Sequence, residues 1–183
     1  AWSPAAFSRM IGPAVEDACK PFQHALSTRA GTECVGHLFR AACDLDDGLC
    51  VLSVDGIGAF DHVRRASMLR KLAALPKAQA ALPFVRLSYA SRTEYVWADE
   101  EGEEHLIHQG EGGEQGDPLT PLLFSLGIHD ALVEVAASLL PGEDLVAFLD
   151  DVYVLCRPER VRVVYDMLRE ALGRIAGIEL HNG

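Results

Sequence analysis

The sequence predicts an α+β fold in which a small, mostly antiparallel sheet packs on helices. Short apolar runs rich in β-branched residues, at 48–55 and 143–157, have the length of strands. Longer segments place apolar residues at helical spacing, and the two kinds of element do not alternate strictly along the chain. The 183 residues are 49% apolar, which is enough for one domain with a full hydrophobic core.

The N-terminal part is predicted to be mostly helical. Ser3 can cap a first helix with Pro4 at its first position, and we expect Pro13 to interrupt or restart that helix. A second helix is predicted over 28–44. A buried strand is predicted over 48–55, because this apolar run follows a turn-like Asp-Asp-Gly sequence.

The middle of the chain combines helices with a hairpin. An amphipathic helix is predicted over 62–75, where Pro76 ends it, and a second one over 78–90. Two apolar-alternating runs within 92–110 flank the acidic stretch Glu100–Glu104. This pattern predicts a β-hairpin whose turn carries solvated charges.

The C-terminal part begins with a glycine-rich loop and ends with a strand–helix–strand order. The elements expected in sequence are the loop 110–118, a long buried helix 118–140, two strands 143–150 and 151–157 that meet at Asp150-Asp151, a helix 158–177 and a strand 178–182.

The charge of the chain is −11 and is unevenly distributed. Residues 1–92 carry 11 Lys and Arg against 8 Asp and Glu, whereas residues 93–183 carry 5 against 19. An acidic domain argues against a phosphate-binding surface. Bound divalent cations, or basic regions of a longer polypeptide, would reverse that inference.

Cysteines, histidines and hydropathy limit the classes of protein further. The five cysteines form no CxxC pair, so we expect free, mostly buried thiols and a reducing, intracellular compartment, either nucleus or cytoplasm. His105 and His108 form an HxxH without a second ligand pair, which disfavours zinc. No apolar run approaches the ~20 residues of a membrane span, and no signal peptide opens the chain.

Three aspartates are the candidates for chemistry. Asp55 follows one predicted strand, and Asp150 and Asp151 lie between two others. Side chains alternate along a strand, so the two adjacent acids point in different directions. If the strands are neighbours, Asp55 and Asp150 converge, and a divalent cation relieves their repulsion. Oxygen ligands alone suit Mg²⁺ or Mn²⁺, and two such ions serve phosphoryl transfer.

The ordered motifs resemble those of reverse transcriptases, in particular the palm of non-LTR retroelement and group II intron enzymes. "LSVDGIGAFDHV" (52–63) is similar to their motif A, "GGEQGDPLTPLLF" (112–124) to motif B and "AFLDDVYVL" (147–155) to motif C. Only Thr120 departs from the usual QGDPLSPLLF of motif B. "PFQHALSTRAGTECV" (21–35) resembles the segment upstream of motif A, at the border of fingers and palm.

The resemblance implies a fold, a cofactor and catalytic residues. The fold is a right-hand polymerase palm with part of the fingers at its N-terminus. Asp55 and Asp150 are the main ligands of two Mg²⁺ ions, which Mn²⁺ can replace. Asp151 supports them, and the backbone carbonyl of Gly56 completes one metal shell.

The same resemblance implies the nucleotide and primer contacts. The backbone amides near Gly58 and Ala59 meet the triphosphate, and Phe60 is a steric gate that selects deoxynucleotides. Gln115 and Gly116 lie against the nascent base pair. Two further contacts are implied, of Leu149 with the primer end and of Arg29 with the template backbone. Three other assignments come from the residues themselves: Asp61 is expected to cap a helix, Pro118 and Pro121 to start one, and the cations Arg64, Arg65, Arg70 and Lys71 to lie on a solvated helix face.

The resemblance also implies partners and a division of the chain. Residues 1–47 form a helical fingers–palm border segment and residues 48–183 the palm with motifs A, B and C. The thumb and most of the fingers are absent, and so is a lysine that the family carries after motif C. The partners are an RNA template, a DNA primer, deoxynucleoside triphosphates and the remaining fingers and thumb of the same polypeptide, with no membrane. We therefore expect these residues alone to polymerise weakly or not at all.

Two alternatives stay open. The palm of an RNA-directed RNA polymerase uses the same two-metal chemistry, although it usually has Gly before the acidic pair and a polar residue at the steric gate, where this chain has Leu149 and Phe60. A catalytically inactive, domesticated retroelement palm that binds nucleic acid or protein is the other.

Overall fold

The computed structural model describes residues 3–26 and 28–181. The helices are α1 (Pro4–Cys19), α2 (Gly31–Leu45), α3 (Ala59–His62), α4 (Arg65–Ala73), α5 (Leu82–Tyr89), α6 (Thr120–Ala136) and α7 (Val161–Ala171). The short helical turns are η1 (Gln79–Ala81), η2 (Pro158–Arg160) and the π-helical turn η3 (Leu172–Ala176). The strands are β1 (Cys50–Val54), β2 (Thr93–Ala98), β3 (Glu104–Gln109), β4 (Asp144–Phe148) and β5 (Asp151–Cys156).

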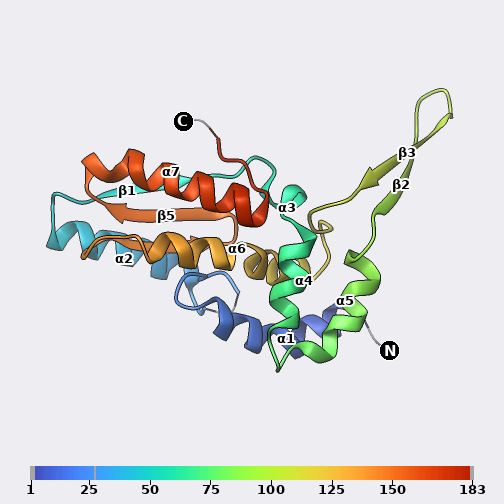
Figure 1. Ribbon diagram of the computed structural model, residues 1–183, viewed down its shortest axis with the longest axis horizontal. Helices are drawn as coiled ribbons and strands as arrows, with labels where there is room; N and C mark the ends of the chain where they lie inside the picture. The colour runs from blue at the N-terminus through green and yellow to red at the C-terminus, as the bar shows by residue number, and fades with distance from the viewer. Residues whose placement is uncertain (1–2, 27, 182–183) are drawn as a thin grey trace.

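Two antiparallel sheets account for these strands. The larger one has the order β1-β5-β4, with Val54 opposite Val152 and Phe148 opposite Asp151. The other is the hairpin β2-β3, which extends away from the rest of the molecule (Figure 1). The predicted α+β class, with a small antiparallel sheet on helices, is confirmed.

Helix α6 lies at the centre of the hydrophobic core. Its sequence is mostly apolar, and twelve of its seventeen residues are buried. Helices α1, α4 and α7 and strand β4 all contact it. Helix α1 presents a buried stripe to the core at every fourth position: Phe7, Ile11, Val15 and Cys19. The core is therefore continuous from the first helix to the last.

Helices cover both faces of the larger sheet, whereas the element order alone suggested one. On one face Val152 and Val154 join the core formed by α6 and α7. On the other, Tyr153 packs edge-on against Phe39 of α2, with ring centroids 5.4 Å apart. Figure 1 shows α6 and α7 on the near side of the sheet and α2 behind it. Strand β5 buries side chains on both faces of the sheet, and this accounts for the second layer of helix.

Three local predictions need correction. Helix α1 runs through Pro13 without a break, because its buried stripe continues on both sides of the proline. Strand β1 was expected to be buried, but it lies at the edge of the sheet and only its Val54 is buried. The expected C-terminal strand is reduced to a single bridge between Gly56 and Leu180, and residues 182–183 lie outside the described part.

The described residues contain no helix that is both long and apolar enough to cross a membrane. All five cysteines are free thiols. Cys19 and Cys156 are buried as expected, but Cys34 is exposed and Cys43 and Cys50 are only half-buried. The expectation of mostly buried thiols therefore holds for two of the five.

Candidate active site at the end of the sheet

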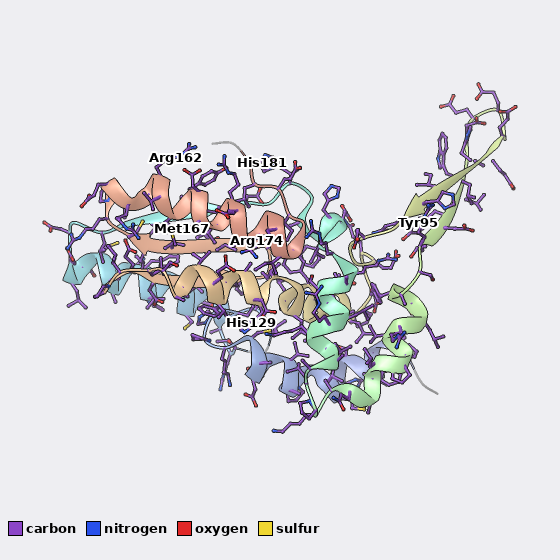
Figure 2. All side chains as sticks on the ribbon, in the orientation of Figure 1. Tyr95, His129, Arg162, Met167, Arg174 and His181 are labelled. Carbon is purple, nitrogen blue, oxygen red and sulfur yellow. The ribbon has the colours of Figure 1, made fainter. Side chains whose placement is uncertain are left out.

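The site begins where strand β1 ends. Asp55 follows Val54 directly, and continuing the β1–β5 register by one residue places it opposite Asp151. Its backbone carbonyl accepts a hydrogen bond from the His181 N–H at 3.1 Å. The Asp55 carboxylate is exposed and lies 3.9 Å from the His181 Nε2. His181 can thus act as a countercharge when it is protonated. Figure 2 shows His181 near the C-terminal end of the described chain.

The other two acids belong to the tight turn between β4 and β5. Asp150 lies in the turn and lines a small cavity together with Gly56 and Ala59. Asp151 is the first residue of β5 and lines a different cavity, of about 430 Å³, with Phe148 and Tyr153. The two adjacent aspartates therefore line different cavities, and Asp150 shares its cavity with Gly56, the residue that follows Asp55.

The three carboxylates form one electrostatic group. The pKa of Asp151 is raised by partial desolvation and then by the negative charges of Asp150 and Asp55. However, in the described part of the chain, residues 3–26 and 28–181, these three carboxylates do not each place an oxygen within 4.8 Å of the other two. Repulsion between like charges opposes closer approach. A donor set made only of carboxylate oxygens and nearby backbone carbonyls fits a hard divalent cation such as Mg²⁺.

Gln23 determines the shape of the turn. Its side-chain amide donates to the Leu149 carbonyl at 2.9 Å, and its amide oxygen accepts from the Leu149 N–H at 3.0 Å. Leu149 has a φ of 56°, in the left-handed region that non-glycine residues rarely adopt. Sequence reasoning missed Gln23, because its partner is 126 residues away and no local pattern marks it.

The glycine-rich loop is hydrogen-bonded to the segment that follows Asp55. The Gly112 N–H donates to the Val63 carbonyl at 2.8 Å, and the Gly113 N–H donates to the Phe60 carbonyl at 2.9 Å. Gly112 has a φ of 73°, and a Cβ there would lie 2.3 Å from the Asp61 carbonyl oxygen. Only glycine allows this approach, so motifs A and B form one continuous surface.

A buried network orders the far end of the loop. The Tyr89 hydroxyl donates to the Asp117 carboxylate at 2.7 Å and lies 3.1 Å from the Thr120 hydroxyl. The Thr120 hydroxyl in turn donates to the Glu114 carbonyl at 2.8 Å. Burial raises the pKa of Tyr89 to about 12, so its proton stays in place at neutral pH. Thr120, the departure from the family's Ser, keeps the hydroxyl that this network needs.

The outer turn of the loop is accessible to a ligand. Gln115 and Gly116 are exposed at its outer turn, and Gly116 has a φ of 88°. Asp117 accepts a hydrogen bond from the Leu119 N–H at 2.9 Å, which helps to start α6. The structure thus separates a hydrogen-bonded inner half of the loop from an accessible outer turn.

The turn after Asp55 carries Gly58, Ala59 and Phe60. Gly58 precedes α3 with a φ of 52°, and Ala59 is buried. The Phe60 ring stacks on Phe124 of α6, with centroids 4.3 Å apart and planes 20° apart, and is only half-buried. Asp61 lies inside α3, so the prediction that it caps a helix is wrong.

Arg65 departs most from expectation. A solvated helix face was predicted for it, but only 4% of it is exposed. Its guanidinium donates to the carbonyls of Gly112 at 2.9 Å and Ser91 at 2.8 Å, and to the Thr93 hydroxyl at 3.2 Å. Arg65 therefore joins the glycine-rich loop to the base of the hairpin. Arg29 is exposed in the turn before α2, as a template contact requires.

Among the residues that the structure describes, one other group of side chains could bind a metal. Asp99, Glu103 and His105 come together at the exposed end of the hairpin. The Asp99 carboxylate already accepts the N–H groups of Glu101 and Glu103 and contacts His105 Nε2 at 2.7 Å. These bonds explain the cluster as the closure of the hairpin turn.

A small antiparallel sheet with carboxylates at the ends of two neighbouring strands, and a glycine-rich loop bonded to the first, defines a polymerase-type palm. The family model for reverse transcriptase (RNA-dependent DNA polymerase) matches residues 3–182. The chain therefore belongs to the reverse transcriptase family.

Solved telomerase structures share this fold. Apo telomerase from Candida tropicalis aligns with a TM-score of 0.75 and 10% identity, over 98% of this chain and 36% of that one. Its form truncated from the C-terminal domain aligns with a TM-score of 0.70 and 11% identity, over 98% and 39%. Telomerase from Candida albicans, in complex with a fragment of telomeric RNA, aligns with a TM-score of 0.68 and 12% identity, over 97% of this chain and 34% of that one. The chain thus spans between a third and two fifths of these proteins. No curated protein matches the sequence.

Proposed function

We propose that the chain forms the catalytic palm of an RNA-directed DNA polymerase of the non-LTR retroelement or group II intron type. The observation that carries the proposal is the antiparallel pairing of β1 with β5, which places Asp55 beside the turn with Asp150 and Asp151. Residues 1–47 then form the fingers–palm border and residues 48–183 the palm. The rest of the fingers and the thumb belong to the same polypeptide.

The acidic group is the proposed metal site. Asp55 and Asp150, with Asp151 in support and the Gly56 carbonyl beside them, hold two divalent cations, Mg²⁺ or Mn²⁺. When bound, these ions lower the pKa of the attacking primer hydroxyl and stabilise the leaving pyrophosphate. Partial desolvation and then repulsion from Asp150 and Asp55 raise the pKa of Asp151, and the repulsive part supports this assignment because a cation relieves it.

The protein's own residues position the substrates. The turn at Gly58 and Ala59 offers backbone amides to a triphosphate. Phe60, fixed by its stacking on Phe124, presents a ring edge where a ribose 2′-hydroxyl would clash. The exposed turn of Gln115 and Gly116 lies against the nascent base pair, Leu149 contacts the primer end, and Arg29 contacts the template.

The partners in this proposal are an RNA template, a DNA primer and deoxynucleoside triphosphates. The Candida albicans telomerase structure contains telomeric RNA, which supports RNA as a ligand of this fold. The five free thiols support an intracellular location, nucleus or cytoplasm.

Primer extension on an RNA template by the full-length protein with Mg²⁺ tests the proposal. Asp150→Asn should lower the rate at least a hundredfold, whereas Asp144→Asn, an exposed carboxylate of β4, should leave it unchanged. Wild-type synthesis by Asp150→Asn would refute the assignment. Phe60→Ala should admit ribonucleotides, and an unchanged preference for deoxynucleotides would remove the gate.

A further inference from the structure

The stretch 64–92 is the most basic part of the chain. It contains seven Lys and Arg and no Asp or Glu, although the net charge of the protein is −11. It covers helices α4 and α5 and the approach to strand β2. The functions assigned above do not account for this local excess of positive charge.

A cavity of about 550 Å³ lies between these two helices. Four arginines line it: Arg65, Arg70, Arg86 and Arg92. Glu111 is the one acid in the lining, and its carboxylate already accepts the backbone N–H of Arg65 at 2.6 Å. The cavity therefore has a strongly positive lining within an acidic protein.

Three of the arginines have unused hydrogen-bonding capacity. Arg70, Arg86 and Arg92 are exposed, and in the part of the chain that the structure describes none of them forms an ion pair. Arg70 and Arg86 lie in the last turns of α4 and α5, where the helix dipole favours a cation. Arg65 differs, because the wall of the cavity holds its guanidinium.

The lining indicates phosphate as the ligand, and a strand as its carrier. Guanidinium groups bind phosphate in a bidentate manner. The free arginines come from three separate segments and remain open to solvent, which suits successive phosphates of a chain better than one enclosed ion. The aromatic ring of Tyr95 lies exposed at the base of the hairpin (Figure 2), and exposed rings provide stacking surfaces for unpaired bases.

The position of the cavity connects it to the proposed active site. Gly110 and Glu111 belong to its lining and lead directly into Gly112. Arg65 donates to the Gly112 carbonyl from the same wall. A strand whose bases meet the outer turn at Gln115 and Gly116 can therefore continue over the arginines.

We propose that the cavity between α4 and α5 binds the phosphodiester backbone of single-stranded RNA, as the template approaches the site of synthesis. The role as template rests on the proposed function, whereas binding of the strand does not. Arg70, Arg86 and Arg92 make the phosphate contacts, and Arg65 keeps the wall in place.

Salt-dependent binding of a labelled oligouridylate to the full-length protein, measured by fluorescence anisotropy in EDTA, tests this site. The variant Arg70→Gln/Arg86→Gln is compared with Arg9→Gln/Arg40→Gln, which removes two exposed arginines elsewhere and gives the same net charge. Each lost phosphate contact lowers the slope of log K against log salt by about 0.7. We expect a slope lower by about 1.4 for the first variant and little change for the control.

Equal slopes for the two variants would overturn the site. Displacement of the RNA by polyglutamate or by inorganic phosphate at matched ionic strength would overturn it too, in favour of an acidic protein or a free anion. Near-ultraviolet circular dichroism verifies the fold of both variants. Primer extension by the wild type separates the two proposals. If the wild type synthesises DNA but the two variants have equal salt slopes, only the RNA-binding role of the cavity is refuted. If the first variant has the lower slope but the wild type does not synthesise DNA, only the polymerase function is refuted.

Discussion

Gln23 and Leu149, 126 residues apart in the sequence, exchange two hydrogen bonds through a single side-chain amide. The segment around Gln23 also pairs with β4, because Ala147 N–H donates to the Phe22 carbonyl and His24 N–H donates to the Ala147 carbonyl. The N-terminal segment, which is not a strand of the sheet, thereby holds the turn that carries Asp150 and Asp151.

Gln23→Ala should destabilise the protein and loosen the acidic turn. Two partly buried hydrogen bonds are lost and the Leu149 N–H is left without a partner, so we expect the free energy of unfolding, measured in urea, to fall by about 2 kcal/mol. Mn²⁺ affinity, measured by electron paramagnetic resonance, should fall several-fold. Gln79→Ala is the control, because this exposed glutamine makes one bond, to the Ala73 carbonyl. Equal effects of the two substitutions would contradict the role of Gln23.

Gly112→Ala should separate the glycine-rich loop from motif A. The new Cβ would meet the backbone of Asp61 and the left-handed φ would be strained, so we expect a loss of about 3 kcal/mol or more. Gly102→Ala provides a matched control, since Gly102 has a φ of 82° but open space around it. Its cost should be about 1 kcal/mol. Thermal unfolding of both variants measures the difference, and equal costs would show that strain alone decides.

Asp151→Asn should stabilise the metal-free protein at neutral pH. The pKa of Asp151 is raised in the folded state, so its contribution favours folding at low pH and is lost as the pH rises through the folded pKa. The gain from the substitution should be a few tenths of a kcal/mol, because solvent screens this exposed group. Urea midpoints at pH 7 should show the gain, and midpoints below pH 4 should not. Asp47→Asn, an exposed aspartate in the turn before β1, is the control.

His129 should make the protein sensitive to mild acid. Burial lowers its pKa, nearby Lys71 lowers it further and Asp130 partly opposes both. A lowered histidine pKa means that stability is present above the unfolded value near 6.5 and is lost as the pH falls through the folded value. His129, which lies on α6 (Figure 2), faces the Phe22 ring and has an unpaired buried Nδ1. His129→Leu should therefore flatten the stability profile between pH 7 and 5, whereas His37→Leu on the exposed side of α2 should not.

Much of the fold could be predicted from local patterns. The hairpin, the helix α6 and the strand pair around Asp150 and Asp151 each carry a periodicity and turn residues that agree with the structure. Pro13 and β1 were misjudged because tertiary burial, not local propensity, decides whether a helix continues and whether a strand is central.

The site was predictable only in part. The acids and the glycine-rich loop follow from motifs that are contiguous in sequence. Gln23 and Arg65 could not be found in this way, since their partners lie far along the chain, at Leu149 and Gly112. Arg65 follows another arginine at the start of α4, so the local sequence predicts that it is solvated. The glycine-rich loop that buries it is distant in sequence.

Helix α6 has a consequence for how the chain is made. Its partners α1 and α4 are synthesised before it, and β4, α7 and η3 after it. A nascent chain that ends soon after Ala136 therefore leaves uncovered the side of this mostly apolar helix that packs on β4, α7 and η3. We therefore expect stable folding to wait until η3, which ends at Ala176, has left the ribosome.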